Sequence, residues 1–265
     1  MNLFFRELRA HRKSLILWSI GVVFMVAGGM SKYGGLETTG QSMNDLMASM
    51  PKVLQSIMGT GSLDLSTVSG YYGVLFLYLI VMTTIHAAML GANIVSKEER
   101  DKTAEFLLSK PISRGRVITS KVAASLVNIT LINVITLLTS LVVVQYYNDG
   151  ESITPDIIQL MIGMFILQLM FMFIGTAIAS VYKNSKAATS LSTGILLFTF
   201  LLSVVIDMNS KIEGLKYFTP FKYFEAKHLL SGGSFEVVYV LLSLLVIVSS
   251  IAVTYVFYQK RDLSV

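Results

Sequence analysis

Long apolar stretches without a charged residue dominate this chain. Six windows lack Asp, Glu, Lys and Arg, and together they cover 146 of the 265 residues. These windows are residues 14–31, 65–96, 122–148, 157–182, 187–206 and 237–259. A helix needs about 20 apolar residues to cross a hydrocarbon core of about 30 Å, because each residue advances it by about 1.5 Å. The pattern therefore predicts an all-α, polytopic membrane protein with six transmembrane helices, at approximately 14–31, 71–95, 118–146, 157–182, 187–206 and 236–258.

Composition supports a membrane protein and excludes several other classes. Hydrophobic residues make up 54% of the chain and charged residues 14%, against about 25% charged in soluble domains. The apolar runs show no strand-like alternation, which argues against a barrel. The chain has no cysteine, so disulfides and thiolate metal sites are excluded, and its three histidines are too scattered to predict a metal site. We expect residues 1–265 to form a single integral-membrane domain.

The charged residues predict the orientation in the membrane. An even number of spans places both termini on one side, and 15 of the 21 basic residues lie on that side. The net charge is +9 there and −4 on the other side. The positive-inside rule therefore predicts cytoplasmic termini, and we expect a bacterial plasma-membrane protein. The same asymmetry, together with contact with anionic membrane lipids, explains the pI of about 9.3 without any nucleic-acid partner.

Two polar segments carry helical patterns of their own. Residues 1–13 mix apolar and basic side chains, which fits either an amphipathic amino-terminal elbow helix at the membrane surface or a basic flank that only fixes topology. On the external side, apolar residues recur at helical spacing around Pro51. This second pattern predicts external helical loops.

Residues 96–121 form the densest charge cluster in the chain. The pattern predicts a helix over residues 98–109, ended by Pro111, and a cap at Ser113 for the next helix. Apolar side chains set among the charges suit a docking element for another protein. The alternative is an ordinary solvated loop.

The same segment carries a family resemblance. Residues 98–114, followed by Lys121, resemble the pattern E-x-x-x-x-T-x-E-x-L-L-x-x-P-[IV]-S-R…K that follows the second span of type-2 ABC exporter permeases. One departure is Lys102, where many relatives have glycine. The resemblance implies a six-span half-transporter that forms a homodimer or heterodimer and is driven by a separate ABC ATPase subunit. It also implies that residues 98–109 are a coupling helix, with ATPase-coupling positions Glu98, Glu99, Thr103, Glu105, Phe106, Leu107, Leu108, Pro111 and Arg114.

Motifs of catalysis are missing from the sequence. It has no G-x-x-x-x-G-K-[ST] phosphate loop, no H-E-x-x-H helix and no G-x-S-x-G elbow, so we expect no enzyme activity in this chain. We expect no cofactor here, and ATP and magnesium in the partner subunit. The resemblance implies export, and the uncharged spans favour hydrophobic or amphipathic substrates such as antimicrobial or toxin peptides, drugs or lipids. The alternatives are an ion (sodium) exporter, a secondary transporter or a membrane-embedded enzyme. The spans lack the paired carboxylates that a secondary transporter would use.

An aromatic concentration lies before the last span, around Pro220. Aromatic side chains are typical of the membrane interface, so the simpler interpretation is that this segment anchors the protein in the lipid headgroups. The functional alternative is an external gate over the substrate route, formed by Phe218, Phe221, Tyr223 and Phe224.

Overall fold

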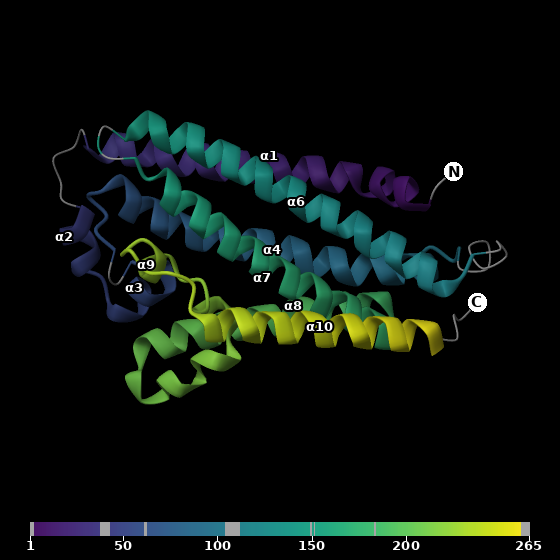
Figure 1. Ribbon diagram of the computed structural model, residues 1–265. Helices are drawn as coiled ribbons and strands as arrows, with labels where there is room; N and C mark the ends of the chain where they lie inside the picture. Colours follow the sequence, from purple (N-terminus) through teal and green to yellow (C-terminus); the bar gives the residue numbers. More distant parts are fainter. Residues whose placement is uncertain are drawn as a thin grey trace.

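The computed structural model is all-α and describes residues 3–37, 43–60, 63–103, 112–148, 150, 152–182 and 184–260 (Figure 1). Its elements, in chain order, are α1 (Leu3–Glu37), α2 (Met43–Ala48), α3 (Lys52–Met58), α4 (Val68–Arg100), α6 (Arg114–Tyr147), α7 (Thr154–Val181), α8 (Ser185–Met208), η1 (Ser210–Phe218), η2 (Pro220–Lys222), α9 (Ala226–Leu229) and α10 (Val237–Lys260).

Six of the described helices are long and apolar enough to cross a membrane: α1, α4, α6, α7, α8 and α10. Each contains one of the stretches predicted from the sequence to within one residue, so the prediction of six membrane helices is confirmed. The helices lie side by side in one elongated bundle, and both chain ends lie at the same end of it (Figure 1). We call this the terminal end. The opposite end, which carries α2, α3 and α9, is the loop end.

The amino-terminal region differs from the expected elbow. Residues 3–13 continue without interruption into the first span, and α1 is one helix of 35 residues. Leu3, Phe4 and Leu8 pack against a buried cluster that includes Ala92 and Val95 of α4. The structure therefore does not show the expected separate elbow helix: residues 3–13 belong to α1, and side-chain contacts with α4 hold them against the bundle.

The two central helices, α4 and α7, approach each other to backbone contact. A Cβ atom at Gly91 would lie 2.1 Å from the carbonyl oxygen of Met172. A Cβ atom at Gly175 would lie 2.5 Å from the carbonyl oxygen of Ala88. No side chain fits at such distances, so these two positions require glycine. In a membrane, where lipid is as apolar as leucine, close packing of this kind supplies much of the attraction between helices.

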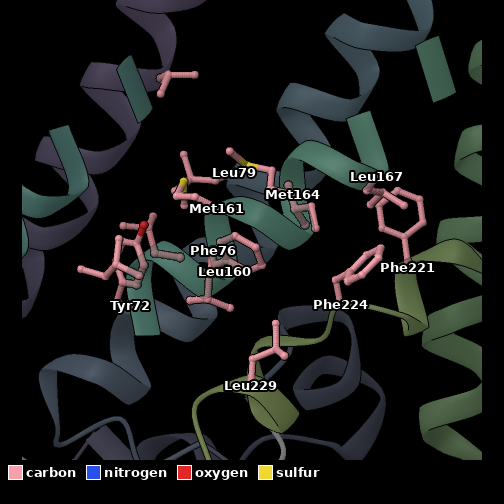
Figure 2. Close-up of a cluster of buried hydrophobic side chains, with 14 of the residues drawn as sticks. Tyr72, Phe76, Leu79, Leu160, Met161, Met164, Leu167, Phe221, Phe224 and Leu229 are labelled. Carbon is pink, nitrogen blue, oxygen red and sulfur yellow. The ribbon is translucent and has the colours of Figure 1, made fainter. Parts of the chain in front are cut away.

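The largest apolar core occupies the half of the bundle nearer the loop end. Side chains from α4 and α7 meet side chains from the segment between α8 and α10 there, as Figure 2 shows. Fully or almost fully buried members include Phe76, Leu79, Leu160, Met164 and Phe224. The core thus packs a segment outside the spans onto the central helices.

The loop end contains the predicted helical loops. Pro51 precedes α3, and Gly59 ends it at a positive φ of 71°, a conformation that glycine adopts at little cost. Asp64 accepts hydrogen bonds from Asn44 of α2 and from the Ser66 hydroxyl, each 2.6 Å long. These hydrogen bonds, that from Ser66 first, lower the pKa of Asp64, which therefore stays ionised and ties α2 to the start of α4.

Candidate functional site

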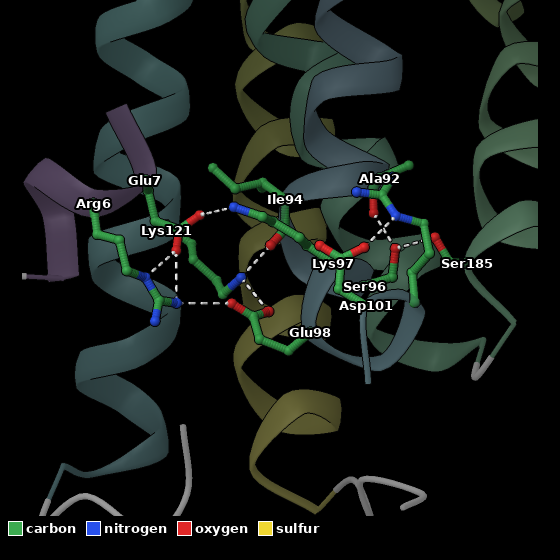
Figure 3. A network of polar contacts seen from close by, with 11 residues as sticks. Arg6, Glu7, Ala92, Ile94, Ser96, Lys97, Glu98, Asp101, Lys121 and Ser185 are labelled. Atoms are coloured by element: carbon green, nitrogen blue, oxygen red, sulfur yellow. Dashed lines mark hydrogen bonds and ion pairs between the residues drawn. The ribbon is translucent and has the colours of Figure 1, made fainter. Parts of the chain in front are cut away.

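Three helices bring five charged side chains together at the terminal end. Arg6 and Glu7 lie on α1, Lys97 and Glu98 on the last turns of α4, and Lys121 near the start of α6 (Figure 3). We call these residues the ionic cluster. Its three cations and two carboxylates give a net charge of +1. Because α1, α4 and α6 all contribute, the ionic cluster joins three spans at the point where α4 ends.

A buried ion pair forms the centre of the ionic cluster. Lys121 Nζ lies 2.6 Å from Glu98 Oε2 and also donates to the Ile94 carbonyl. The Lys121 side chain is fully buried, and Glu98 is 5% exposed. Removing one partner of such a pair leaves an uncompensated charge and costs about 3–5 kcal/mol. The pair therefore fixes α6 against the end of α4.

Arg6 and Glu7 attach α1 to the same place. Arg6 Nη2 lies 3.2 Å from Glu98 Oε1 and 3.0 Å from Glu7 Oε1. Glu7, which is fully buried, faces Lys97 Nζ at 3.6 Å. Each carboxylate of the ionic cluster thus contacts two cations, and three of these four contacts run between helices.

The chain turns sharply at the end of α4. Asp101 caps the helix, and its N–H donates to the Lys97 carbonyl at 2.8 Å. Lys102 has a φ of +54°, and it is the only non-glycine residue with positive φ among those described. Thr103 N–H then donates back to the Glu98 carbonyl at 2.8 Å. A left-handed residue after a helix is a common terminator, but it favours glycine.

This turn corrects the sequence prediction of a coupling helix that begins at Glu98. Glu98 and Glu99 belong to the last turn of α4, and regular helix stops one residue later, at Arg100. The reason is twofold: the side chain of Glu98 is held inside the bundle by Lys121, and Lys102 adopts a conformation that ends a helix.

Three of the four predicted gate residues are buried inside the protein at the loop end. Phe221 and Tyr223 are each 6% exposed and Phe224 is 1% exposed, whereas Phe218 is 72% exposed. Figure 2 shows Phe221 and Phe224 pointing into the apolar core. Tyr223 stacks on Tyr239 of α10 at 4.7 Å between ring centroids.

The Tyr223 hydroxyl also serves a structural purpose. It donates to the Tyr217 carbonyl at 2.6 Å. Burial raises the pKa of Tyr223 to about 12, so the hydroxyl keeps its proton. The aromatic segment is therefore packed against α7, α8 and α10 by its own side chains, and only Phe218 of the four is free to contact lipid.

A family comparison covers almost the whole chain. A family described as ABC-2 family transporter protein matches residues 1–263. The chain belongs to this family. Members of the ABC-2 permease family are multi-pass transmembrane subunits that lack the ATPase domain and work with an ATPase subunit. No curated protein matches this sequence.

The predicted coupling residues of this ABC-2 permease lie in different parts of the structure. Glu98 lies in the ionic cluster, and Glu99 and Thr103 flank the turn after α4. Arg114 begins α6 and donates to the Gln259 carbonyl of α10 at 3.0 Å. The predicted cap is present, since Ser113 Oγ accepts from the Arg116 N–H at 3.3 Å. The remaining predicted positions lie outside the described residues: Glu105, Phe106, Leu107, Leu108 and Pro111.

Sequence reasoning missed most of the ionic cluster. Arg6 and Lys97 were not predicted to contact a carboxylate, Lys121 entered only as a position of the family pattern and as a topology charge, and Glu7 was not singled out. One signal was available, because Lys121 directly precedes a window of 27 uncharged residues and a lysine there has to find a partner or reach water. Among the described residues, no three histidine or carboxylate side chains are grouped so that they could hold a metal ion.

Proposed function

We propose that this ABC-2 permease is the membrane half of an ATP-driven exporter. Hydrophobic or amphipathic substrates move outward through it, and ATP and magnesium bind in the separate ATPase subunit. The observation that carries the proposal is the ionic cluster, because it sits directly before the segment where the ATPase would dock. Both termini, and therefore the terminal end of the bundle, face the cytoplasm in this proposal, in agreement with the excess of basic residues there.

Coupling follows from the contacts of Glu98. A force applied to the chain just after Arg100 reaches α4 directly, since the two are covalently continuous. Glu98 passes it to α6 through Lys121 at 2.6 Å and to α1 through Arg6 at 3.2 Å. Three spans then move together when the ATPase changes conformation. The docking surface itself consists of Glu99, Thr103, Glu105, Phe106, Leu107, Leu108, Pro111 and Arg114.

Substrates pass between two permease copies in this proposal. The spans of one copy carry too few polar side chains to line a water-filled pore, whereas an interface between copies can form a transient apolar slot. Apolar side chains on the outside of α1 and α8 are available for lipid or for a second copy, for example Ile20, Phe24, Phe198 and Leu201. The partner permease is either a second copy of this chain, which gives a homodimer, or a different chain, which gives a heterodimer. Phe218 is the exposed member of the proposed gate, and the other three hold its loop in position.

Coupling is tested by co-expressing the permease with an ABC ATPase encoded beside it. Leu107→Asp introduces a charge on the proposed docking surface, and we expect the ATPase to stop co-purifying and ATP-dependent efflux of an amphipathic dye to stop. The matched control is Leu215→Asp, because Leu215 is exposed on η1 at the loop end. Wild-type ATPase capture and efflux by Leu107→Asp would overturn the docking role of this segment.

Orientation is tested by single cysteines in the cysteine-free chain. Ser49, Gly150 and Gly232 are exposed at the loop end, and Lys186 is exposed at the terminal end. We expect a membrane-impermeant maleimide to label the first three positions on intact cells and Lys186→Cys only after lysis. Labelling of Lys186→Cys from outside would reverse the orientation.

A further inference from the structure

A cavity of about 260 Å³ lies at the loop end, within a single copy of the chain. It is enclosed by α3, α4, α8 and the segment from η2 to α9. Four phenylalanines form much of its apolar wall: Phe76, Phe200, Phe221 and Phe224. Figure 2 shows three of them, Phe76, Phe221 and Phe224, around the same part of the core. Sequence reasoning placed Phe221 and Phe224 in a gate, whereas the structure makes them walls of a cavity.

Charged residues form one side of the cavity. Asp207, Glu225 and Lys227 line it. Lys227 Nζ lies 2.9 Å from Asp207 and 3.1 Å from Glu225. Lys222 contacts the same two carboxylates, at 2.6 Å from Asp207, but its side chain is only 7% exposed and it does not line the cavity.

The charged group on this side of the cavity is therefore neutral. Two carboxylates, Asp207 and Glu225, are balanced by two ammonium groups, those of Lys222 and Lys227. Lys227 is the more replaceable of the two lysines, since its side chain is 42% exposed, and Asp207 is 32% exposed and so reachable from outside. Burial lowers the pKa of Lys227, but the charge of Glu225 and the contact with Asp207 raise it by more, so Lys227 remains a cation.

We propose that this cavity binds a monocationic amphiphile. Its ammonium head replaces that of Lys227 between Asp207 and Glu225, so the two carboxylates keep two cationic partners. Its apolar body lies among the four phenylalanines, whose ring faces attract both apolar groups and cations. An anionic head is disfavoured, because it would have to separate both lysines from carboxylates that already neutralise them. The volume is just below the usual range of about 300–1,000 Å³ for small-molecule sites, so it suits one small amphiphile rather than a folded peptide.

This inference rests on the proposed function for the onward route of the cargo, and it narrows the cargo to cationic amphiphiles. The binding step needs neither the ATPase nor a second copy, because all lining residues belong to one chain. Binding and transport can therefore fail independently. Export without binding in this cavity would overturn the proposed site and keep the proposed exporter function. Binding in the cavity without export would keep the site and overturn the exporter function.

The test is equilibrium binding of radiolabelled decyltrimethylammonium to the permease in phosphatidylcholine nanodiscs, with empty nanodiscs as background. We expect saturable binding that unlabelled decyltrimethylammonium competes away and that decyl sulfate and decanol, which share its chain length, do not. Asp207→Asn should weaken binding at least tenfold. Glu213→Gln is the matched control, because Glu213 pairs with Lys216 on η1 and lies outside the cavity wall.

A second pair of variants guards against misfolding of Asp207→Asn. Ser56 faces the cavity from α3, a helix with no buried residues, so Ser56→Trp should fill the cavity without unfolding the bundle. Its control is Val53→Trp, because Val53 is 46% exposed on the same helix and does not line the cavity. Loss of binding in Ser56→Trp alone supports the site. Absence of saturable binding, equal competition by decyl sulfate, or equal binding by the two tryptophan variants overturns it.

Discussion

Lys121→Met is the most informative single change in this permease. Methionine keeps the length and apolar stem of lysine but removes the charge that faces Glu98 at 2.6 Å. Breaking a buried ion pair costs about 3–5 kcal/mol, because the remaining charge stays buried without its partner. Arg6 remains 3.2 Å from Glu98, and it compensates part of that charge. We therefore expect a loss near the lower limit, about 3 kcal/mol in the free energy of unfolding.

The double variant Lys121→Met/Glu98→Met separates the pair from its surroundings. Replacing both members of a buried ion pair by apolar residues is often neutral. The cost of the double variant should therefore be smaller than the sum of the two single costs by about 2 kcal/mol or more. Lys211→Met is the matched control, since Lys211 is exposed at the loop end, and we expect it to change stability by less than about 0.5 kcal/mol.

Unfolding is measured in mixed micelles by titration with sodium dodecyl sulfate. The chain has a single tryptophan, Trp18 on α1, and its ring lies 5.2 Å from the imidazole of His86 on α4. Its fluorescence therefore reports separation of α1 from α4, two of the three helices that the ionic cluster joins. A loss below about 1 kcal/mol for Lys121→Met, or additive single costs, would refute the conclusion that the pair holds α6 to α4.

Three further predictions use the same unfolding measurement. Lys102→Gly should stabilise the permease by about 1 kcal/mol, because glycine adopts the left-handed conformation without strain. Lys102→Ala keeps a Cβ atom and should give no such gain. Equal effects of the two substitutions would contradict the strain at this turn. Gly91→Ala should cost about 1–3 kcal/mol through overpacking against α7, while Gly194→Ala, which has open space around it, should cost nothing measurable. Phe224→Ala should cost about 3–5 kcal/mol and Phe218→Ala less than about 0.5 kcal/mol, and a comparable loss in both would show that Phe218 is not exposed.

The six spans were predictable because each carries about 20 consecutive residues without a charge, and a helix is the structure that satisfies its own backbone in lipid. Pro51 likewise marked the break between α2 and α3, since its ring is compatible with a helix start and not with a helix interior. Ser113 marked the start of α6 because its hydroxyl can accept from the backbone two or three residues later. These features are local, so the residues concerned are neighbours in the sequence.

The ionic cluster was not predictable in the same way. Glu98 lies 23 positions from Lys121 and 92 positions from Arg6, and charge patterning alone does not say which cation faces which carboxylate. The burial of Phe221 and Phe224 also depends on how the segment after α8 folds back onto α7. For Lys102, the sequence showed a lysine where relatives have glycine, but the positive φ that explains the preference came only from the structure.

The glycine contacts between α4 and α7 determine how motion can travel through this bundle. Axial sliding of α4 along α7 would move Gly91 away from Met172 and bring a side chain against that carbonyl, for which there is no room. These contacts therefore oppose sliding of α4 along α7. If the ATPase docks after α4 as proposed, a displacement of α4 is passed to α7, whose 28 residues span about 42 Å. The first residue of α7, Thr154, would then move in step with Arg100, the last residue of α4, although the two lie at opposite ends of the bundle.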